Sequence, residues 1–362
     1  MRVLAGRGVL GPGWGAAFAQ TPRHAFVPFY LDGDTITVAH TESGLGQVYS
    51  DRPLITELGL LDRAGSLAGS GQPSVTAQML DWLAVDAGDR VLQIGIGTGY
   101  ETALLCHRVG DTQVTGVDAD EQVMLTAKVR LAGVGHRPHL SAADLTDGAA
   151  GGGSFGRILS MVAVPSLPPA WVTQLARGGR VVAEIRGPLA SAVLVADKTT
   201  PSAVRGRFRD LSPHYPPAAP MPAVQPQLQP ASWFQPAQAR YASTVEVPAD
   251  AFDDRDFRFL LQLSIPGLSP IADQAPDGTP GVFLHAADGS WLLYKPTGPC
   301  GGEIADGGPQ PLWEIIDNLW QRWHAWHLPG IARLGMTCHD DGRSYLWLDQ
   351  ESTTVTTLPP PP

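Results

Sequence analysis

The chain has 362 residues, of which 43% are hydrophobic and 17% charged, and its formal net charge is -10. This length is sufficient for two domains, and the acidic excess argues against nucleic acid and anionic membrane surfaces as partners because their phosphates are repelled. The three cysteines, Cys106, Cys300 and Cys338, lack the spacing of a disulfide framework or metal site, so we expect reduced thiols, no bound metal and a cytoplasmic protein. Glycine and proline interrupt the apolar runs near the N-terminus, and no run is long enough to span a membrane.

Helices and strands are predicted to alternate from residue 72 to residue 187. Apolar residues at helical spacing predict helices over 72–85, 100–110, 121–135 and 168–179. Short apolar runs predict strands within 86–95, 112–120, 155–164 and 180–187. This alternation is typical of a mostly parallel sheet with helices on both faces, so we expect a Rossmann-like α/β domain.

The second half of the chain differs in composition. Residues 210–240 are rich in proline and glutamine, which favours an extended linker. Beyond it we expect strands in 257–267, 281–295 and 343–349, with hairpin turns at Asp288-Gly289 and Asp341-Gly342. An aromatic helix is predicted over 311–330, with most of its tryptophans in the core and Trp326 free for a contact.

These elements predict five segments. They are an N-terminal helical segment on the substrate side (1–70), the α/β domain (71–210), the linker (211–245), a smaller α+β accessory domain (246–352) and a disordered tail (353–362).

A glycine loop follows the first strand of the α/β pattern. Gly95, Gly97 and Gly99 form G-x-G-x-G, with Ile96 and Thr98 between them. A nicotinamide-binding loop needs its third glycine at position 100, where this chain has a tyrosine that would crowd the helix against the strand. The tighter turn favours a cofactor without a phosphate at that point, such as S-adenosylmethionine.

Two acidic residues support the same cofactor. Asp118 ends the second strand, where a carboxylate can accept hydrogen bonds from both hydroxyls of a ribose. Asp144 lies between the predicted helix over 121–135 and the strand within 155–164, and is placed to meet the adenine amino group. We therefore predict an S-adenosylmethionine site made by residues 95–99, Asp118 and Asp144.

Residues 47–187 resemble protein-L-isoaspartate O-methyltransferases, which esterify a side-chain carboxylate of a peptide. The matching stretches are "YSDRPL", "SGQPSVTAQML", "RVLQIGIGTGYETALL", "VTGVDAD", "AADLTDG" and "FGRILSMVAVPSLPPAWVTQLARGGRVV", and "AFAQTPRHAFVP" resembles the N-terminal segment of the family. The resemblance implies a class I methyltransferase fold. It also implies that the residues lining the carboxylate pocket are Ser70, Gln72, Pro73, Val162 and Val164, although roles in a helix entry and a strand end are equally open for them.

The sequence departs from this family at two positions. Gly71 stands where the repair enzymes place a serine near the substrate carboxylate, and Leu145 stands where a glycine is expected. Together with the C-terminal region, these departures resemble the homologues encoded beside ribosomally made peptides, in ATP-grasp and lanthipeptide maturation systems. That resemblance implies methylation of an aspartate in a precursor peptide, either linear or already macrocyclised, leading to an aspartimide or isoaspartate, and association with a maturation ligase.

Three other functions are alternatives to this one. One is repair of isoaspartyl residues in damaged proteins, and another is a non-catalytic peptide-binding module on a methyltransferase fold. A nicotinamide oxidoreductase is disfavoured by Tyr100. An aspartate carboxylate is already ionised at neutral pH, so its methylation needs positioning and no general base, and we predict no catalytic side chain. His136 and His139 are expected to be surface histidines without an acidic partner.

Overall fold

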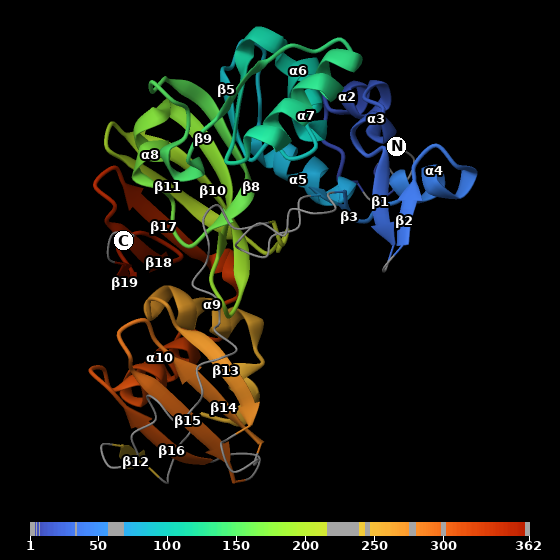
Figure 1. Ribbon diagram of the computed structural model, residues 1–362. Helices are drawn as coiled ribbons and strands as arrows, with labels where there is room; N and C mark the ends of the chain where they lie inside the picture. The colour runs from blue at the N-terminus through green and yellow to red at the C-terminus, as the bar shows by residue number, and fades with distance from the viewer. Residues whose placement is uncertain are drawn as a thin grey trace.

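The computed structural model describes residues 8–32, 35–56, 69–215, 239–242, 247–274, 280–297 and 302–358, together with Leu4 and Gly6. Figure 1 shows a larger body built on a ten-stranded sheet and a smaller body, built on a five-stranded sheet, beneath it. Among the described residues, no helix combines the length and apolar character needed to cross a bilayer.

The parallel half of the large sheet confirms the predicted Rossmann-like domain. Its strands run in the order β9-β8-β5-β6-β7. They are β5 (Val91–Ile94), β6 (Val114–Asp118), β7 (His139–Ala142), β8 (Phe155–Val164) and β9 (Leu175–Arg186). The helices are α5 (Pro73–Leu83), α6 (Tyr100–Val109), α7 (Glu121–Gly133) and α8 (Pro169–Gln174). The chain order reverses around β5, and ligands of such sheets bind at the carboxyl ends of the strands at this switch point.

Local signals explain where these helices begin. Pro73 occupies the first turn of α5, where its missing N–H costs nothing. The Asp120 carboxylate accepts hydrogen bonds from the amides of Gln122 and Val123 and so caps α7. Helix α6 starts directly after Gly99, whose left-handed backbone turns the chain out of β5.

The antiparallel half of the sheet corrects the predicted domain boundaries. β10 (Ser191–Thr200) and β11 (Ala203–Arg209) extend the sheet from β9, and three C-terminal strands follow, β17 (Leu334–His339), β18 (Ser344–Leu348) and β19 (Thr354–Leu358). The predicted accessory domain 246–352 is therefore divided between two sheets. The predicted tail 353–362 is wrong for residues 354–358, because Val355 and Leu358 are buried as part of a strand; residues 359–362 lie outside the described residues.

The smaller sheet has the order β12-β16-β15-β14-β13 and is antiparallel throughout. Its strands are β12 (Arg240–Ala242), β13 (Ser269–Gln274), β14 (Pro280–His285), β15 (Trp291–Pro296) and β16 (Gly302–Gly307). The predicted turns at Asp288-Gly289 and Asp341-Gly342 are confirmed, with both glycines at φ +87°. β12 lies within the predicted linker, of which residues 216–238 and 243–246 lie outside the described residues.

Two helices, α9 (Arg255–Ser264) and α10 (Leu312–Ala325), pack between the two sheets. α10 confirms the aromatic helix, whereas the strand predicted over 257–267 is wrong, because most of it belongs to α9. Asp254 caps this helix by accepting from the amides of Asp256 and Phe257. Trp326 packs against the core beneath the Arg322 guanidinium, 4.8 Å from its ring centre, and is not free.

A single hydrophobic core joins the two bodies. It includes Trp171 beside β9, Phe208 in β11, Phe259 in α9, Ile316 in α10 and Leu346 in β18, all at most 1% exposed. The rings of Phe208 and Phe259 meet edge to face at 4.9 Å. The small sheet therefore shares the core of the Rossmann-like domain.

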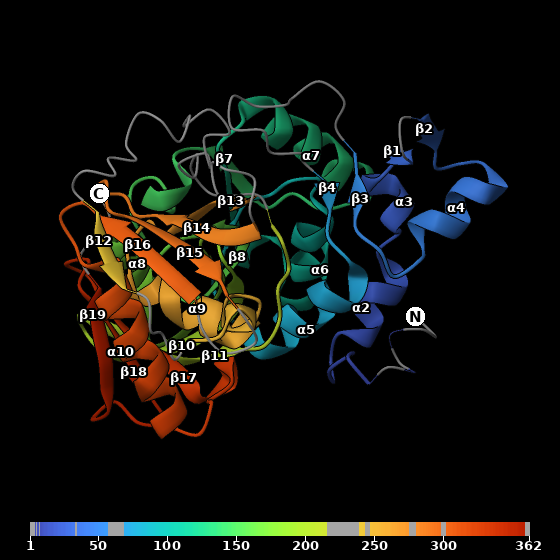
Figure 2. The ribbon, with the colours of Figure 1, turned by 90° about the horizontal axis from the view of Figure 1, so that it is seen from below.

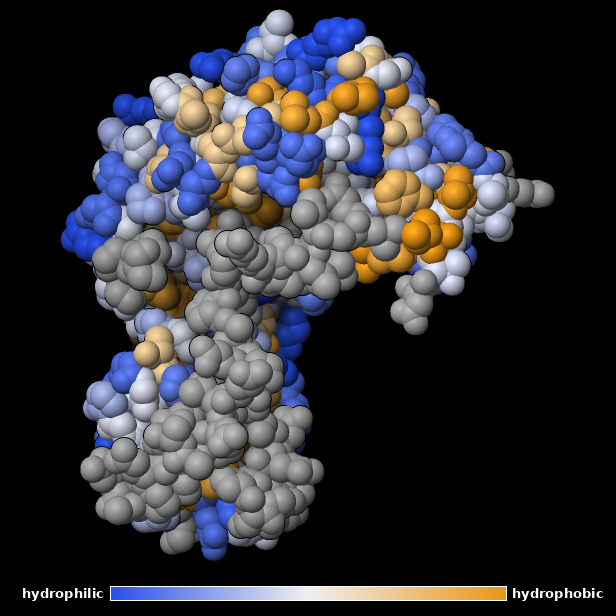
Figure 3. Space-filling view, viewed as in Figure 1, coloured by the Kyte–Doolittle hydropathy of each residue, from blue (hydrophilic) through white to orange (hydrophobic). Residues whose placement is uncertain are grey.

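The N-terminal segment is only partly helical. Its helices are α2 (Gly15–Gln20), α3 (Arg23–Phe26) and α4 (Glu42–Val48), and its strands are β1 (Phe29–Asp32), β2 (Thr35–Val38), β3 (Leu54–Ile55) and β4 (Gly69–Ser70). Figure 2 shows this segment on the opposite side of the molecule from the small sheet. Apolar side chains gather over the β1–β2 hairpin in Figure 3, where Ile36 and Val38 are half exposed.

Candidate active site

The glycine loop leaves the carboxyl end of β5 and enters α6 with a backbone that favours glycine. Gly95, Gly97 and Gly99 have φ of +80°, +53° and +87°. A Cβ on Gly95 would lie 2.8 Å from Val162 Cγ1, and one on Gly99 would lie 3.2 Å from the Ala127 Cβ. Ile96 and Thr98 are buried between them. The loop thus presents backbone rather than side chains at the switch point, which lets a cofactor approach the main chain closely.

Asp118 ties this loop to the neighbouring strand β6. Its Oδ2 accepts hydrogen bonds from the amides of Ile96 at 2.8 Å and Gly97 at 3.0 Å, and its Oδ1 accepts from the Asp120 amide at 3.2 Å. The sequence predicted a ribose ligand here but not this bracing role. Since Oδ1 accepts only one of these three bonds, it keeps capacity for a further donor such as a ribose hydroxyl.

Asp144 lies at the same edge of the sheet. The Ala143 amide donates to the Asp118 carbonyl at 3.0 Å, which joins the ends of β6 and β7. Asp144 Oδ1 accepts from the Thr146 amide at 2.8 Å and from its hydroxyl at 2.6 Å, and these bonds lower the pKa of the carboxyl. The structure therefore brings the two predicted acids to one edge, both with an oxygen open to a ligand.

Leu145, which stands where the family has glycine, belongs to the core. Its side chain is 4% exposed, and the Trp171 indole N–H donates to its carbonyl at 2.8 Å. The departure is thus accommodated by packing against α8 and leaves Asp144 at the edge.

The predicted substrate residues Ser70, Gln72 and Pro73 lie where the chain enters α5. The Ser70 hydroxyl is buried and accepts from the Arg23 guanidinium at 3.2 and 3.3 Å. The side-chain amide of Gln72 donates to Asp51 Oδ2 at 3.3 Å, and Pro73 is buried at the first turn of the helix. Each of these side chains has a structural role in this arrangement.

Val162 and Val164 are buried at 5% and 1% exposure. Val162 packs against Gly95 and so supports the glycine loop, and both valines belong to the core cluster shared with the small sheet. Packing accounts for both side chains.

Arg23 anchors the chain segments around the entry to α5, a role that the sequence did not predict. It is 2% exposed, and its guanidinium donates to the carbonyls of Val48 at 2.8 Å and Gly71 at 2.7 Å, and also to those of Ser50 and Arg52. Burial lowers the pKa of this side chain. The carbonyl groups that it satisfies come from backbone positions, which leave no signal in side-chain identity.

A buried polar cluster, made by Thr76, Glu101 and Tyr215, adjoins Gly71. A Cβ on this glycine would lie 3.3 Å from Thr76 Oγ1, 3.6 Å from the Tyr215 ring and 3.7 Å from Glu101 Oε1. The Glu101 carboxyl accepts from the Thr76 hydroxyl at 3.2 Å, and burial raises its pKa. Within the described residues, the buried Tyr215 hydroxyl has no hydrogen-bond partner.

This polar cluster lies beside the glycine loop. The Gly69 carbonyl is 3.5 Å from the Cβ position of Gly97, and Glu101 belongs to the first turn after the loop. Adenosine held by Asp118 and Asp144 would occupy the β6–β7 side, so the other end of the cofactor would point toward Gly71.

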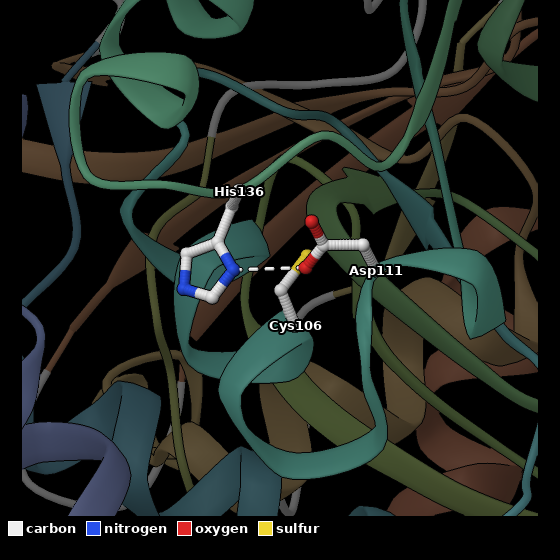
Figure 4. Close-up of side chains that lie close together, drawn as sticks. All are labelled: Cys106, Asp111 and His136. Carbon is white, nitrogen blue, oxygen red and sulfur yellow. Dashed lines mark hydrogen bonds and ion pairs between the residues drawn. The ribbon is translucent and has the colours of Figure 1, made fainter.

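A second cluster contradicts the expected surface histidine at position 136. His136 Nδ1 lies 2.8 Å from Asp111 Oδ1, and Cys106 lies beside both residues (Figure 4).

A cavity of about 350 Å³, lined in part by Trp14, Arg108 and Arg157, lies at the amino ends of the strands and includes none of the predicted site residues.

The fold, the glycine loop and the two acids define a class I methyltransferase that uses S-adenosylmethionine. The family model described as protein-L-isoaspartate(D-aspartate) O-methyltransferase matches residues 16–208, and the chain belongs to this family of carboxyl methyltransferases.

Relatives named protein-L-isoaspartate O-methyltransferase agree with this assignment. One from Anaeromyxobacter dehalogenans is 35% identical over 170 residues, which are 46% of this chain and 69% of the relative. One from Koribacter versatilis is 32% identical over 195 residues, which are 54% of this chain and 78% of the relative.

A solved structure named protein-L-isoaspartate O-methyltransferase has the same fold at a TM-score of 0.57 and 21% identity. The match covers 96% of this chain and 98% of the other. Because the match extends through the C-terminal elements, the two proteins share the fold of that region as well.

Proposed function

We propose that this protein esterifies an aspartate side-chain carboxylate in a ribosomally made precursor peptide. The observation that carries the proposal is the glycine at position 71, where the resemblance to repair enzymes implies a serine hydroxyl near the substrate carboxylate. This chain lacks that hydroxyl, and the neighbouring Ser70 is not a free substitute because its hydroxyl is held by Arg23. A site without this hydroxyl favours a different peptide.

The site residues suit S-adenosylmethionine, which supplies an electrophilic methyl group when bound. The left-handed glycines leave open backbone where a Cβ at position 95 or 99 would collide with a neighbour, and Asp118 and Asp144 offer acceptors to the ribose and the adenine. The substrate carboxylate is ionised at neutral pH, so the chain must orient it and exclude water rather than remove a proton.

The methyl ester is the activated product. The backbone nitrogen of the next residue in the peptide can attack the ester carbonyl, with loss of methanol, to close an aspartimide. Water can then open this imide to isoaspartate. We assign the cyclisation to the peptide itself, since a backbone nitrogen next to a methyl ester can close the five-membered ring without help from the protein; an enzyme variant that methylates normally but accumulates the ester would contradict this assignment.

Mass spectrometry of a precursor peptide encoded beside this gene tests the proposal. The linear and macrocyclised peptides are incubated with the protein and S-adenosylmethionine, in parallel with a generic isoaspartyl peptide, and Asp118→Ala serves as the control without a cofactor site. A transient methyl gain followed by net loss of water, on the precursor alone, is expected. Methylation confined to the isoaspartyl peptide would refute the proposal.

Repair of isoaspartyl residues is the second candidate. It is favoured by the likeness in fold, over nearly the full length, to a solved protein that carries this name. The same experiment distinguishes the two, because only a repair enzyme would prefer the isoaspartyl peptide to the precursor.

A further inference from the structure

A cysteine, an aspartate and a histidine converge at the end of α6 that is remote from the glycine loop (Figure 4). Cys106 lies in the last turn of α6, Asp111 begins the short helix η1 (Asp111–Gln113), and His136 lies between α7 and β7. One sulfur, one oxygen and one nitrogen atom from these side chains lie within 4.8 Å of one another. Neither the family assignment nor the proposed function uses them.

The backbone brings these residues together through two glycine turns. Gly110, at φ +87°, ends α6 and returns the chain so that Asp111 lies beside Cys106. Gly135, at φ +91°, ends α7, and the His136 amide then donates to the Leu131 carbonyl at 2.9 Å. The arrangement is therefore set by helix ends rather than by the flexible side chains alone.

The cluster is a partly enclosed anionic site. The Cys106 side chain is buried, and the side chains of Asp111 and His136 are 29% and 21% exposed, which leaves access from solvent. Burial opposes ionisation of Asp111, but hydrogen bonds from the Arg137 amide and the His136 ring together lower the pKa of its carboxyl. A cation entering from solvent would meet this carboxylate first.

The three donor atoms match the preferences of one metal in particular. Thiolate sulfur, imidazole nitrogen and carboxylate oxygen are the ligands of Zn²⁺, which commonly takes four in a tetrahedron. We propose that Cys106, Asp111 and His136 bind Zn²⁺, with the fourth position open to water.

Binding would exchange a proton for the metal. The Cys106 thiol, whose pKa is raised by burial, would lose its proton to solvent as the sulfur–zinc bond forms. The neutral His136 ring would bind through Nδ1 and carry its proton on Nε2, so one proton is released for each metal bound.

The role of the metal is structural. Cys106 and the loop residue Gly99 are separated by about 10 Å along α6, from the rise of an α-helix, so the metal lies away from the site of methyl transfer. It would join the end of α6 to the turn before β7 and so stabilise the half of the domain that carries Asp118 and Asp144. A metal bound only by the folded chain raises its stability by mass action.

Cobalt provides the test because Co²⁺ reports thiolate ligation by a charge-transfer absorption in the near ultraviolet. Metal-stripped protein is titrated with Co²⁺ and then with Zn²⁺. We expect an absorption that saturates at a single equivalent and is abolished by Zn²⁺, together with a thermal midpoint that rises with Zn²⁺.

Matched variants assign the site. Cys106→Ala and His136→Asn should lose the absorption and the zinc-dependent rise, whereas Cys338→Ala, Cys300→Ala and His139→Asn should keep both. An absorption that is absent in the parent protein, or that survives in both ligand variants, would overturn the proposal. A thermal midpoint that falls in His136→Asn but does not respond to Zn²⁺ in the parent would show that the cluster is a hydrogen-bond network only.

Discussion

Asp118 should be needed for the shape of the glycine loop as well as for the cofactor. Asp118→Ala leaves the amides of Ile96 and Gly97 without their acceptor. Each partly buried, unsatisfied amide costs about 1–2 kcal/mol, so we expect the free energy of unfolding to fall by about 2–4 kcal/mol. Asp118→Asn can keep both bonds through its amide oxygen, but its NH2 group replaces Oδ1, so it loses the charge and the bond from the Asp120 amide, which should cost about 1–2 kcal/mol.

Two measurements separate these effects. Urea unfolding gives the stability of each variant, and calorimetry with S-adenosylhomocysteine gives cofactor affinity. Asp144→Ala is the matched control, because its carboxylate bonds only an exposed turn at Thr146 and should lower affinity with little effect on stability. If Asp118→Ala unfolds at the same urea concentration as the parent, the carboxylate does not brace the loop and the reasoning is wrong.

Three further predictions test the packing and charge around the site, each by urea unfolding. Gly95→Ala should lower the free energy of unfolding by at least about 2 kcal/mol, through left-handed strain and the collision with Val162. Adding Val162→Ala to this variant should restore only part of the lost stability, and full restoration would contradict the strain. Arg23→Lys should cost about 3 kcal/mol, because one ammonium cannot serve the carbonyls that the guanidinium bonds, and an unchanged midpoint would refute this. Burial raises the pKa of Glu101 above 4.5. The stability of Glu101→Gln should therefore match that of the parent below about pH 4.5 and exceed it increasingly as the pH rises. Parallel curves of stability against pH would disprove the shift.

The parallel half of the fold and the cofactor edge could be predicted from local patterns. Helical and strand periodicity located α5 to α7, β5, β6 and β8, and the carboxyl ends of parallel strands meet at one edge, so Asp118 and Asp144 could be placed together. The glycine spacing was informative because each glycine meets a specific backbone requirement, namely a left-handed φ.

Partners distant in the sequence could not be predicted. Arg23 binds backbone carbonyls, which every residue has, so its role leaves no motif. His136 finds its acidic partner in Asp111 only because two helix ends meet in space. The stretch from Phe257 is apolar enough for a strand. It forms a helix because Asp254 caps its start and because it packs between two sheets.

The C-terminal region constrains either function in the same way. β17 pairs with β11, so the strands after α10 complete the sheet whose other half carries the glycine loop. α9 lies between the two sheets, with Phe259 against Phe208. A region that shares its core with the methyltransferase domain cannot swing independently as a tethered arm. The shared core therefore holds the small sheet in one fixed geometry relative to the methyltransferase domain, so any peptide that contacted both would be aligned by the fold and not by a hinge.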